Sequence, residues 1–327
     1  MKALISHDTA LAYWRLHFPL DSSLGDPALF SEAEAFASRK EDVLGSVPEF
    51  ILDPDRPADI LVPNANFRRG SARVAPHVWS SSYPDGSFYK IGEAYVSSPE
   101  FLFLQMASQL SIVQLAALGC ELCGTYVLLP QGVKHPGSLD ELPKRASSLS
   151  SLEALTAFVR AAKGSRGKSK ALRALNYVVD GSRSPMETMT CLLLCLSPML
   201  GGYGLPLPKM NEVIELDEEG RKIARRRHCE GDLCWRAGKL DIEYHGEVHV
   251  GKLQMKSDVG RTLGIEHMDW KVITVTSPQV LDIDQFEVVA KEAAKRLGRR
   301  LHPRIVGRTL ARQIAHDDLS DWMGLPR

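Results

Sequence analysis

The chain has no excess of either charge and no long apolar run. Its 327 residues include 40 Lys and Arg and 40 Asp and Glu, so any affinity for nucleic acid has to come from local basic patches. The longest apolar run, Met189 to Leu200, is far shorter than the ~20 residues that cross a bilayer. We therefore expect a protein with no membrane partner, and its length fits two domains.

Cysteine is scarce too, and its spacing is not that of a disulfide framework. The first eight residues turn polar at once, which is not typical of a secretory signal and predicts a cytoplasmic location. Cys120 and Cys123 have the spacing of half a zinc site, but Cys229 and Cys234 lie five apart and make a poor second half. A zinc-stapled interaction module therefore remains only a weak alternative.

Two strand-like runs, 231–235 and 240–245, flank a short turn at 236–239. Polar and apolar side chains alternate along the second run, which places three polar groups on one face: Asp241, Glu243 and His245. Asp232 meets this face if the two runs pair as a hairpin. The pattern then predicts a cluster of acids and imidazole on a rigid element.

Such a cluster suits a metal-dependent nuclease. Mg²⁺ takes oxygen ligands, often only one or two carboxylates, which Asp232 and Glu243 can supply. His245 and His249 would orient water or carry protons, because imidazole titrates near neutral pH. A surface hairpin with ordinary polar residues on its wet face is the alternative reading.

The neighbouring segments follow a recognisable order. Ser184 to Glu187 opens an apolar run, and the hairpin is followed by Asp258 to Leu263 and then by a strand-like segment from Trp270 to Thr276. This order resembles the very-short-patch repair endonuclease and its uncharacterised DUF559-type relatives in the PD-(D/E)xK nuclease superfamily. The resemblance implies a restriction-endonuclease-like domain with a central mixed sheet flanked by helices.

The resemblance also implies roles for individual residues. Glu187 matches the helix acid, Asp232 the metal-binding Asp and Glu243 the acid of the third motif, with Mg²⁺ or Mn²⁺ as the cofactor. His245 and His249 match two histidines, although His245 stands where the wider superfamily has Lys. The following helix is matched by Asp258 and Arg261, which also read as an on-helix pair with a positioning role.

Glu187 has a structural reading as well. Ser184, Pro185 and Glu187 form the pattern of a capping box, in which Glu187 satisfies backbone donors at the start of a helix. The same reasoning predicts a later helix from Gln285 to Leu297, capped by Asp282. Both interpretations of Glu187 stay open at this point.

Two basic patches flank the hairpin in sequence, from Lys163 to Arg173 and from Arg221 to Arg227. We predict phosphate contacts from five of their residues: Lys168, Lys170, Arg225, Arg226 and Arg227. Solvated charged faces are the alternative. Aromatic and basic residues are not interleaved as in RNA-binding proteins, which favours DNA over RNA.

The amino-terminal half reads as an α+β module. Extended pieces at 59–63 and 86–91 precede an apolar helix predicted over 101–118 and capped by Ser98. The segments Ile5–Leu11 and Val96–Glu100 resemble those of type IV abortive-infection antitoxin-like proteins of actinobacteria. That resemblance implies a DNA-binding or regulatory role.

The sequence therefore predicts an α/β protein with four consecutive parts. These are an α+β antitoxin-like module at 1–130, a linker and connecting helix at 131–165, a PD-(D/E)xK nuclease-like domain at 166–302 and a tail at 303–327. The predicted function is metal-dependent DNA endonuclease, in a defence or toxin–antitoxin setting with a cognate toxin or defence protein as partner. The alternative is a non-catalytic DNA-binding regulator or antitoxin that retains the nuclease fold.

Overall fold

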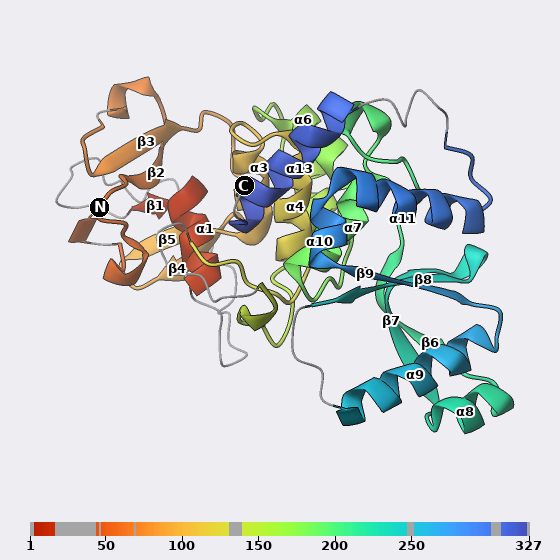
Figure 1. Cartoon of the computed structure of the whole chain (residues 1–327). Coiled ribbons are helices and arrows are strands. Elements are labelled where there is room, and N and C mark those ends of the chain that lie inside the picture. The colour runs from red at the N-terminus through yellow and green to blue at the C-terminus, as the bar shows by residue number, and fades with distance from the viewer. Residues whose placement is uncertain are drawn as a thin grey trace. The chain divides into compact units, whose positions relative to one another are not determined.

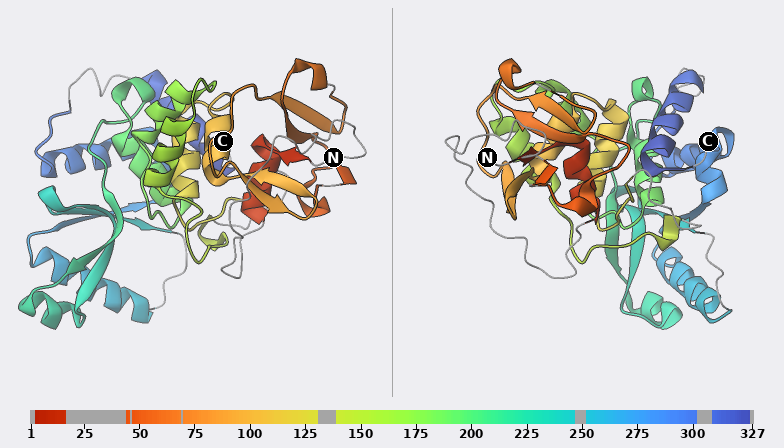
Figure 2. Two further views of the ribbon diagram at one scale, coloured as in Figure 1. Left: turned by 180° about the vertical axis from the view of Figure 1, so that it is seen from behind. Right: turned by 90° about the vertical axis from the view of Figure 1, so that its left-hand side faces the viewer.

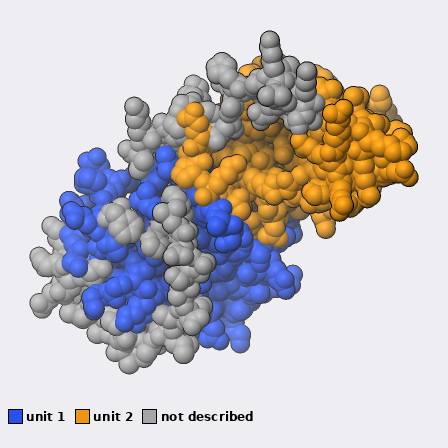
Figure 3. All heavy atoms as spheres, turned by 90° about the horizontal axis from the view of Figure 1, so that it is seen from below, with its two compact units in different colours: residues 1–115, 127–134, 145–176 blue, residues 116–126, 135–144, 177–327 orange. Residues whose placement is uncertain are grey.

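The chain divides into two units, which the computed structural model describes over residues 3–16, 44–45, 47–68, 70–130, 139–246, 252–301 and 309–325. Unit 1 consists of Met1–Leu115, Val127–Lys134 and Arg145–Asn176, and unit 2 of Ala116–Tyr126, His135–Lys144 and Tyr177–Arg327 (Figure 3). Each unit is therefore built from three separate stretches of the chain, whereas the sequence had suggested consecutive domains joined by a linker. Residues 139–144, from the expected linker, belong to unit 2.

Unit 1 is built on a five-stranded mixed sheet with the order β3-β2-β1-β5-β4. The strands are β1 Leu4–Ile5, β2 Ala58–Val62, β3 Val74–Val78, β4 Phe88–Ile91 and β5 Ala94–Ser97. β1 pairs parallel with β5 and antiparallel with β2, while β4 and β5 form a hairpin. The extended pieces predicted at 59–63 and 86–91 correspond to β2 and β4.

Four helices of unit 1 are α1 His7–Leu16, α3 Pro99–Met106, α5 Leu152–Ala161 and α6 Lys168–Leu175. Aromatic side chains cluster in the core of this unit. Phe101 packs edge-to-face on Trp79 and Phe88, with ring centroids 4.8 and 5.5 Å away. Trp14 of α1 is fully buried and its indole N–H donates to the carbonyl of Ser97 at 2.8 Å, which ties α1 to β5.

The single helix predicted over 101–118 is wrong, because two helices occupy this region. α3 ends at Met106, and α4 spans Ile112–Leu122. Ser111 begins the second helix: its hydroxyl accepts from Gln114 N at 3.1 Å, and the Gln114 side chain accepts from Ser111 N at 3.2 Å. The apolar run continues across both helices, so hydrophobicity alone did not reveal the capping box between them.

Unit 2 contains a four-stranded mixed sheet with the order β6-β7-β8-β9. The strands are β6 Lys209–Glu215, β7 His228–Trp235, β8 Leu240–His245 and β9 Lys271–Thr276. β6, β7 and β8 pair antiparallel, and β9 runs parallel to β8. The strand-like runs predicted here are therefore present, and the parallel pair is connected through the helix α9, Lys252–Glu266.

Helices cover both faces of this sheet. α9 and α11 (Ile283–Arg296) lie on opposite sides of the β8–β9 pair (Figure 1), and α8 (Glu218–Ala224) packs beside α9 (Figure 2). The remaining helices of unit 2 are α7 Pro185–Cys195, α10 Ser277–Leu281 and α13 Thr309–Met323. Asp282 caps α11, as predicted, by accepting from Gln285 N at 2.8 Å. Helices on both sides of mixed sheets place the chain in the α/β class.

The carboxy-terminal helix α13 packs on other elements of unit 2. α13 contacts α7 and the 3₁₀ turn Pro198–Leu200. Arg312 of α13 lies over the ring of Tyr203, 4.4 Å from its centroid, and its Nη1 bonds Glu287 of α11 at 2.6 Å. No helix among the described residues is long and apolar enough to cross a membrane.

Candidate functional site

The β7–β8 hairpin forms as predicted. Leu233 pairs with Ile242 and Cys234 with Asp241, around the turn Arg236–Gly238. The paired register ends at Leu233 and Ile242, and beyond it the Asp232 side chain accepts from Tyr244 N of β8. Asp241 and Glu243 share a face of β8 by strand alternation, and both lie close enough to Asp232 for the carboxyl charges to affect one another's pKa values. We call these three residues the acidic face.

Asp232 is held by the backbone of the neighbouring strand. Its Oδ2 accepts from Tyr244 N at 2.8 Å. Burial, followed by the negative charges of Glu243 and Glu187, raises the pKa of Asp232 to about 8. Asp232 on β7 thus lies near Glu243 on β8 and near Glu187 on α7.

Asp241 is the member of the acidic face to which the sequence reasoning assigned no role. It is fully buried, and burial together with Glu243 raises its pKa to about 10. The Cys234 thiol donates to Asp241 Oδ1 at 3.6 Å, while Oδ2 has no hydrogen-bond partner among the described residues. Strand alternation in the sequence predicted that Asp241 and Glu243 share a face of the strand. It did not predict that both carboxyl groups are buried.

Glu243 is paired with a cation from α9. Its Oε2 lies 2.7 Å from Arg261 Nη2, with side-chain exposures of 6% and 16%. Arg261 Nη1 also donates to the carbonyl of Glu230 on β7 at 2.6 Å. The other oxygen, Glu243 Oε1, is buried without a hydrogen-bond partner among the described residues. Arg261 thus has the positioning contact expected of it, directed at Glu243 and the backbone of β7.

Glu187 lies in the first turn of α7 and has the capping role that its pattern suggested. Ser184 Oγ accepts from Glu187 N at 3.1 Å, and Glu187 Oε2 accepts from Arg183 N at 2.9 Å, one residue before the cap. Asn211 Nδ2 donates to the same oxygen at 2.8 Å. Burial raises the pKa of Glu187 despite these bonds.

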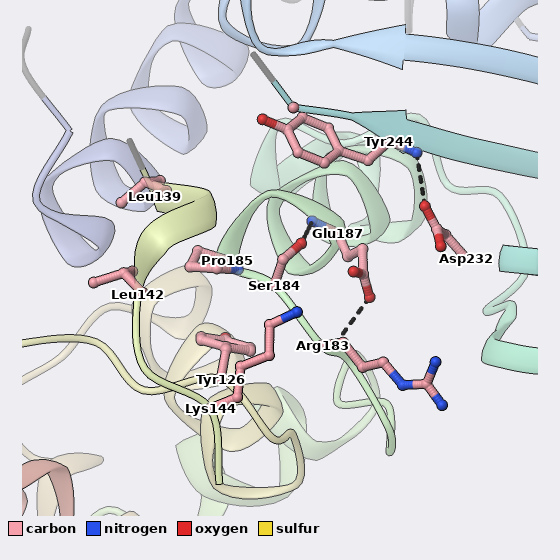
Figure 4. Close-up of a pocket in the computed structure, with 11 residues that line it drawn as sticks. Tyr126, Leu139, Leu142, Lys144, Arg183, Ser184, Pro185, Glu187, Asp232 and Tyr244 are labelled. Carbon is pink, nitrogen blue, oxygen red and sulfur yellow. Dashed lines mark hydrogen bonds between the residues drawn. The ribbon is translucent and has the colours of Figure 1, made fainter. Parts of the chain in front are cut away.

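Glu187 and Asp232 line a common cleft of about 190 Å³ within unit 2 (Figure 4). Lys144 and Arg183 line it as well, so two cations accompany the two acids. The remaining lining residues are Tyr126, Leu139, Leu142, Ser184, Pro185, Tyr244 and Gly246. The cleft therefore joins α7 and the hairpin to the 139–144 segment, which the sequence had suggested was a linker.

Other predicted residues lie elsewhere. His245 is exposed at the end of β8, whereas His249 and the side chain of Asp258 lie outside the described residues. Arg225, Arg226 and Arg227 are exposed between α8 and β7 in unit 2.

The two lysines of the other patch belong to unit 1 and have backbone partners. Lys168 Nζ donates to the carbonyls of Arg160 and Ala162, at 2.7 and 2.8 Å. Lys170 Nζ donates to the carbonyl of Leu110 at 2.9 Å. Both ammonium groups therefore already make internal hydrogen bonds.

The cysteines are core residues. All six are buried and form no disulfide, as predicted. Burial raises the pKa of the Cys120 thiol, which donates to the Tyr177 carbonyl at 3.9 Å. Within the part of the chain that the structure describes, no group of three or more His, Cys, Asp or Glu side chains is arranged to hold a metal ion.

A site built from two carboxylates suits Mg²⁺ or Mn²⁺ better than zinc. The donors on the acidic face are hard oxygens, and Mg²⁺ commonly uses one or two protein carboxylates with water and phosphate for the rest. Two buried carboxylate oxygens, Glu243 Oε1 and Asp241 Oδ2, have no hydrogen-bond partner among the described residues. The acidic face therefore fits a hard divalent cation chemically.

Comparison with protein-family models, with curated proteins and with solved structures finds no match to this chain.

Proposed function

We propose that unit 2 is a divalent-metal-dependent DNA endonuclease of the PD-(D/E)xK type. The observation that carries the proposal is that the β7–β8 hairpin brings Asp232 near Glu243 while Asp232 and Glu187 line one cleft. A helix acid, a strand acid and an acid on the next strand therefore converge in the order that the resemblance implies. The α/β fold of the unit is compatible with this family.

In this proposal, Asp232 and Glu243 hold Mg²⁺ or Mn²⁺. A bound cation of this kind supplies Lewis-acid stabilisation of charge on a phosphodiester. Lys144 lines the cleft and attracts phosphate, whereas Arg183, which also lines it, is paired with Glu230 at 2.6 Å. Glu187 assists by orienting water beside Asp232, and His245 and His249 carry protons.

DNA cleavage with Mg²⁺ or Mn²⁺ tests the proposal. Asp232→Ala and Glu243→Ala should each lower the rate at least about 100-fold, because the metal contributes several kcal/mol of charge stabilisation. Glu215→Ala is the matched control, since it removes an exposed carboxylate from β6 of the same sheet. Equal rates in all four proteins would show that the cutting does not come from this site.

DNA contact is proposed for the exposed Arg225, Arg226 and Arg227. Replacing all three with Ala should weaken binding at low salt and reduce the slope of log affinity against log salt by up to about three. Lys168→Ala and Lys170→Ala test the other patch, where a smaller effect is expected because both ammonium groups bind carbonyls. Fluorescence anisotropy with labelled duplex DNA measures both sets.

The second candidate is a DNA-binding regulator or antitoxin that keeps the nuclease fold without its chemistry. Two observations favour it: Glu243 is already paired with Arg261, and no three-ligand group is present in the described ranges. Retained DNA binding without cleavage in either metal would support this function. A cognate toxin or defence protein would then be the partner to seek.

A further inference from the structure

Arg261 is the cation that the structure places against the acidic face. Its Nη2 lies 2.7 Å from Glu243 Oε2, and no other ion pair to Asp232, Asp241 or Glu243 is formed among the described residues. Lys144 and Arg183 line the cleft instead, and the Arg183 guanidinium is paired with Glu230 at 2.6 Å. One monovalent charge thus faces three carboxyl groups.

Buried polar atoms beside this pair have no partner outside the acidic face in the part of the chain that the structure describes. Arg261 Nε is buried without a hydrogen-bond partner among the described residues, and Glu243 Oε1 and Asp241 Oδ2 have none beyond the contact between their two carboxyl groups. Unsatisfied buried groups are rare in folded proteins and call for an explanation, such as an ion absent from the coordinates. A divalent ion can contact oxygens on more than one carboxylate at once, which the guanidinium does not do here.

The backbone that carries Arg261 is held firmly, so an exchange of cations has to involve its side chain. α9 packs closely on α8: a Cβ at Gly264 would lie 2.8 Å from that of Ala224 and 2.9 Å from the Gly220 carbonyl. The guanidinium itself keeps 16% of its side chain exposed. Exchange with a metal ion would break the pair with Glu243 and the Nη1 bond to the Glu230 carbonyl, and would turn the guanidinium toward solvent.

We propose that Arg261 is the resident cation of the acidic face, and that a divalent metal ion binds by replacing its guanidinium at Glu243. This inference rests on the proposed metal site, and it makes Arg261 a positioning residue that sets metal affinity. In the absence of metal, Arg261 holds the Glu243 carboxylate in place. The guanidinium competes with the metal ion for Glu243, so the wild-type protein binds metal more weakly than the same carboxylates would without Arg261.

Titration calorimetry of the full chain with Mn²⁺, without DNA, tests this competition. Arg261→Met should bind Mn²⁺ at least about tenfold more tightly than wild type, because the ion no longer displaces a paired charge. The matched control is Arg236→Met, which removes an equal charge from a 60%-exposed side chain paired with Glu212. Adding Asp232→Asn to Arg261→Met should abolish the gain.

A second measurement does not depend on the folding of Arg261→Met. In wild-type protein, Mg²⁺ should shift the NMR resonance of the Arg261 Nε–H group, which is assigned by its loss in Arg261→Lys. The inference is overturned if folded Arg261→Met binds Mn²⁺ no more tightly than wild type, or if neither protein binds it. It is also overturned if saturating Mg²⁺ leaves the Arg261 resonance unchanged.

Cleavage assays separate this inference from the proposed function. If affinity rises in Arg261→Met but no protein cuts DNA, the endonuclease proposal fails and the cation exchange stands. If wild type cuts DNA with Mg²⁺ while the affinity of Arg261→Met does not rise, the exchange fails and the endonuclease stands.

Discussion

The backbone N–H of Tyr244 donates a 2.8 Å hydrogen bond to Oδ2 of Asp232 across the β7–β8 hairpin. The bond fixes one carboxylate oxygen against the neighbouring strand, beside Glu243 and within reach of the charge of Glu187. Secondary structure thus holds the acids together against their mutual repulsion.

Asp241 should make the protein less stable as pH rises. Its folded pKa, raised to about 10 mainly by burial, exceeds its ordinary value of 3.8, so the folded state binds more protons between these limits. Stability should therefore fall with increasing pH across this window. Asp241→Asn should flatten the fall and be more stable than wild type at pH 8–9 by at least about 1 kcal/mol.

Urea unfolding in EDTA at pH 6 and pH 9 measures this effect. The exposed Asp85→Asn is the control for loss of one negative charge. A wild-type protein that gains stability from pH 6 to pH 9, with Asp241→Asn following it in parallel, would contradict the prediction.

Two glycines of α9 form a matched pair. Gly264→Ala places a methyl group 2.8 Å from the Ala224 Cβ and 2.9 Å from the Gly220 carbonyl, so it should destabilise unit 2 by roughly 1–3 kcal/mol. At Gly260 the nearest atom would be the Ile223 carbonyl at 3.6 Å. Gly260→Ala should therefore be neutral, or stabilising by up to about 1 kcal/mol, through its higher helix propensity. Thermal unfolding compares them, and equal midpoints would refute the close α8–α9 packing.

Capping of α7 should matter for the site as well as for stability. Ser184→Ala removes the acceptor of Glu187 N and should cost about 1 kcal/mol. Ser151→Ala removes the corresponding cap of α5, where Ser151 Oγ accepts from Ala154 N at 3.1 Å, and should cost a similar amount. Only Ser184→Ala should also weaken Mn²⁺ binding and cleavage, because it loosens the turn that holds Glu187. Equal losses of function in both variants would point to general destabilisation.

Local patterns in the sequence predicted more than its long-range contacts. Strand alternation and the turn at 236–239 identified the hairpin, and Ser–Pro–x–Glu identified the start of α7, because both depend on neighbours in sequence. The Arg261–Glu243 pair joins α9 to β8, and Lys144 reaches the cleft from a segment that looked like a linker. No spacing encodes these contacts, since they follow from how separate elements pack. Ser111 and Gln114 have the spacing of a capping box, but the apolar sequence on both sides of Ser111 was interpreted as one continuous helix.

His7 should make unit 1 sensitive to acid. Its ring is buried and stacks on His77 at 3.8 Å, and its Nδ1 lies 3.0 Å from Ser6 Oγ. Burial, followed by the charge of His77, lowers the pKa of His7 from 6.5 to about 3. Between these values the unfolded chain binds more protons than the folded one, so stability is full above pH 6.5 and falls as the pH drops toward 3, by up to about 1.4 kcal/mol per pH unit.

His7→Asn should remove this acid sensitivity, because Asn does not titrate and tolerates the left-handed φ of 45° found here. Hydrogen exchange at pH 5 and pH 7, corrected for intrinsic rates, reads each unit separately. His316→Asn is the comparison, since burial lowers the pKa of His316 in unit 2 to about 4. Each substitution should flatten the pH dependence of its own unit alone. If unit 1 keeps its acid sensitivity in His7→Asn, another group is responsible for that sensitivity. The hydrogen-bonded pair of Asp59 and His77, 2.7 Å apart, would then be tested next.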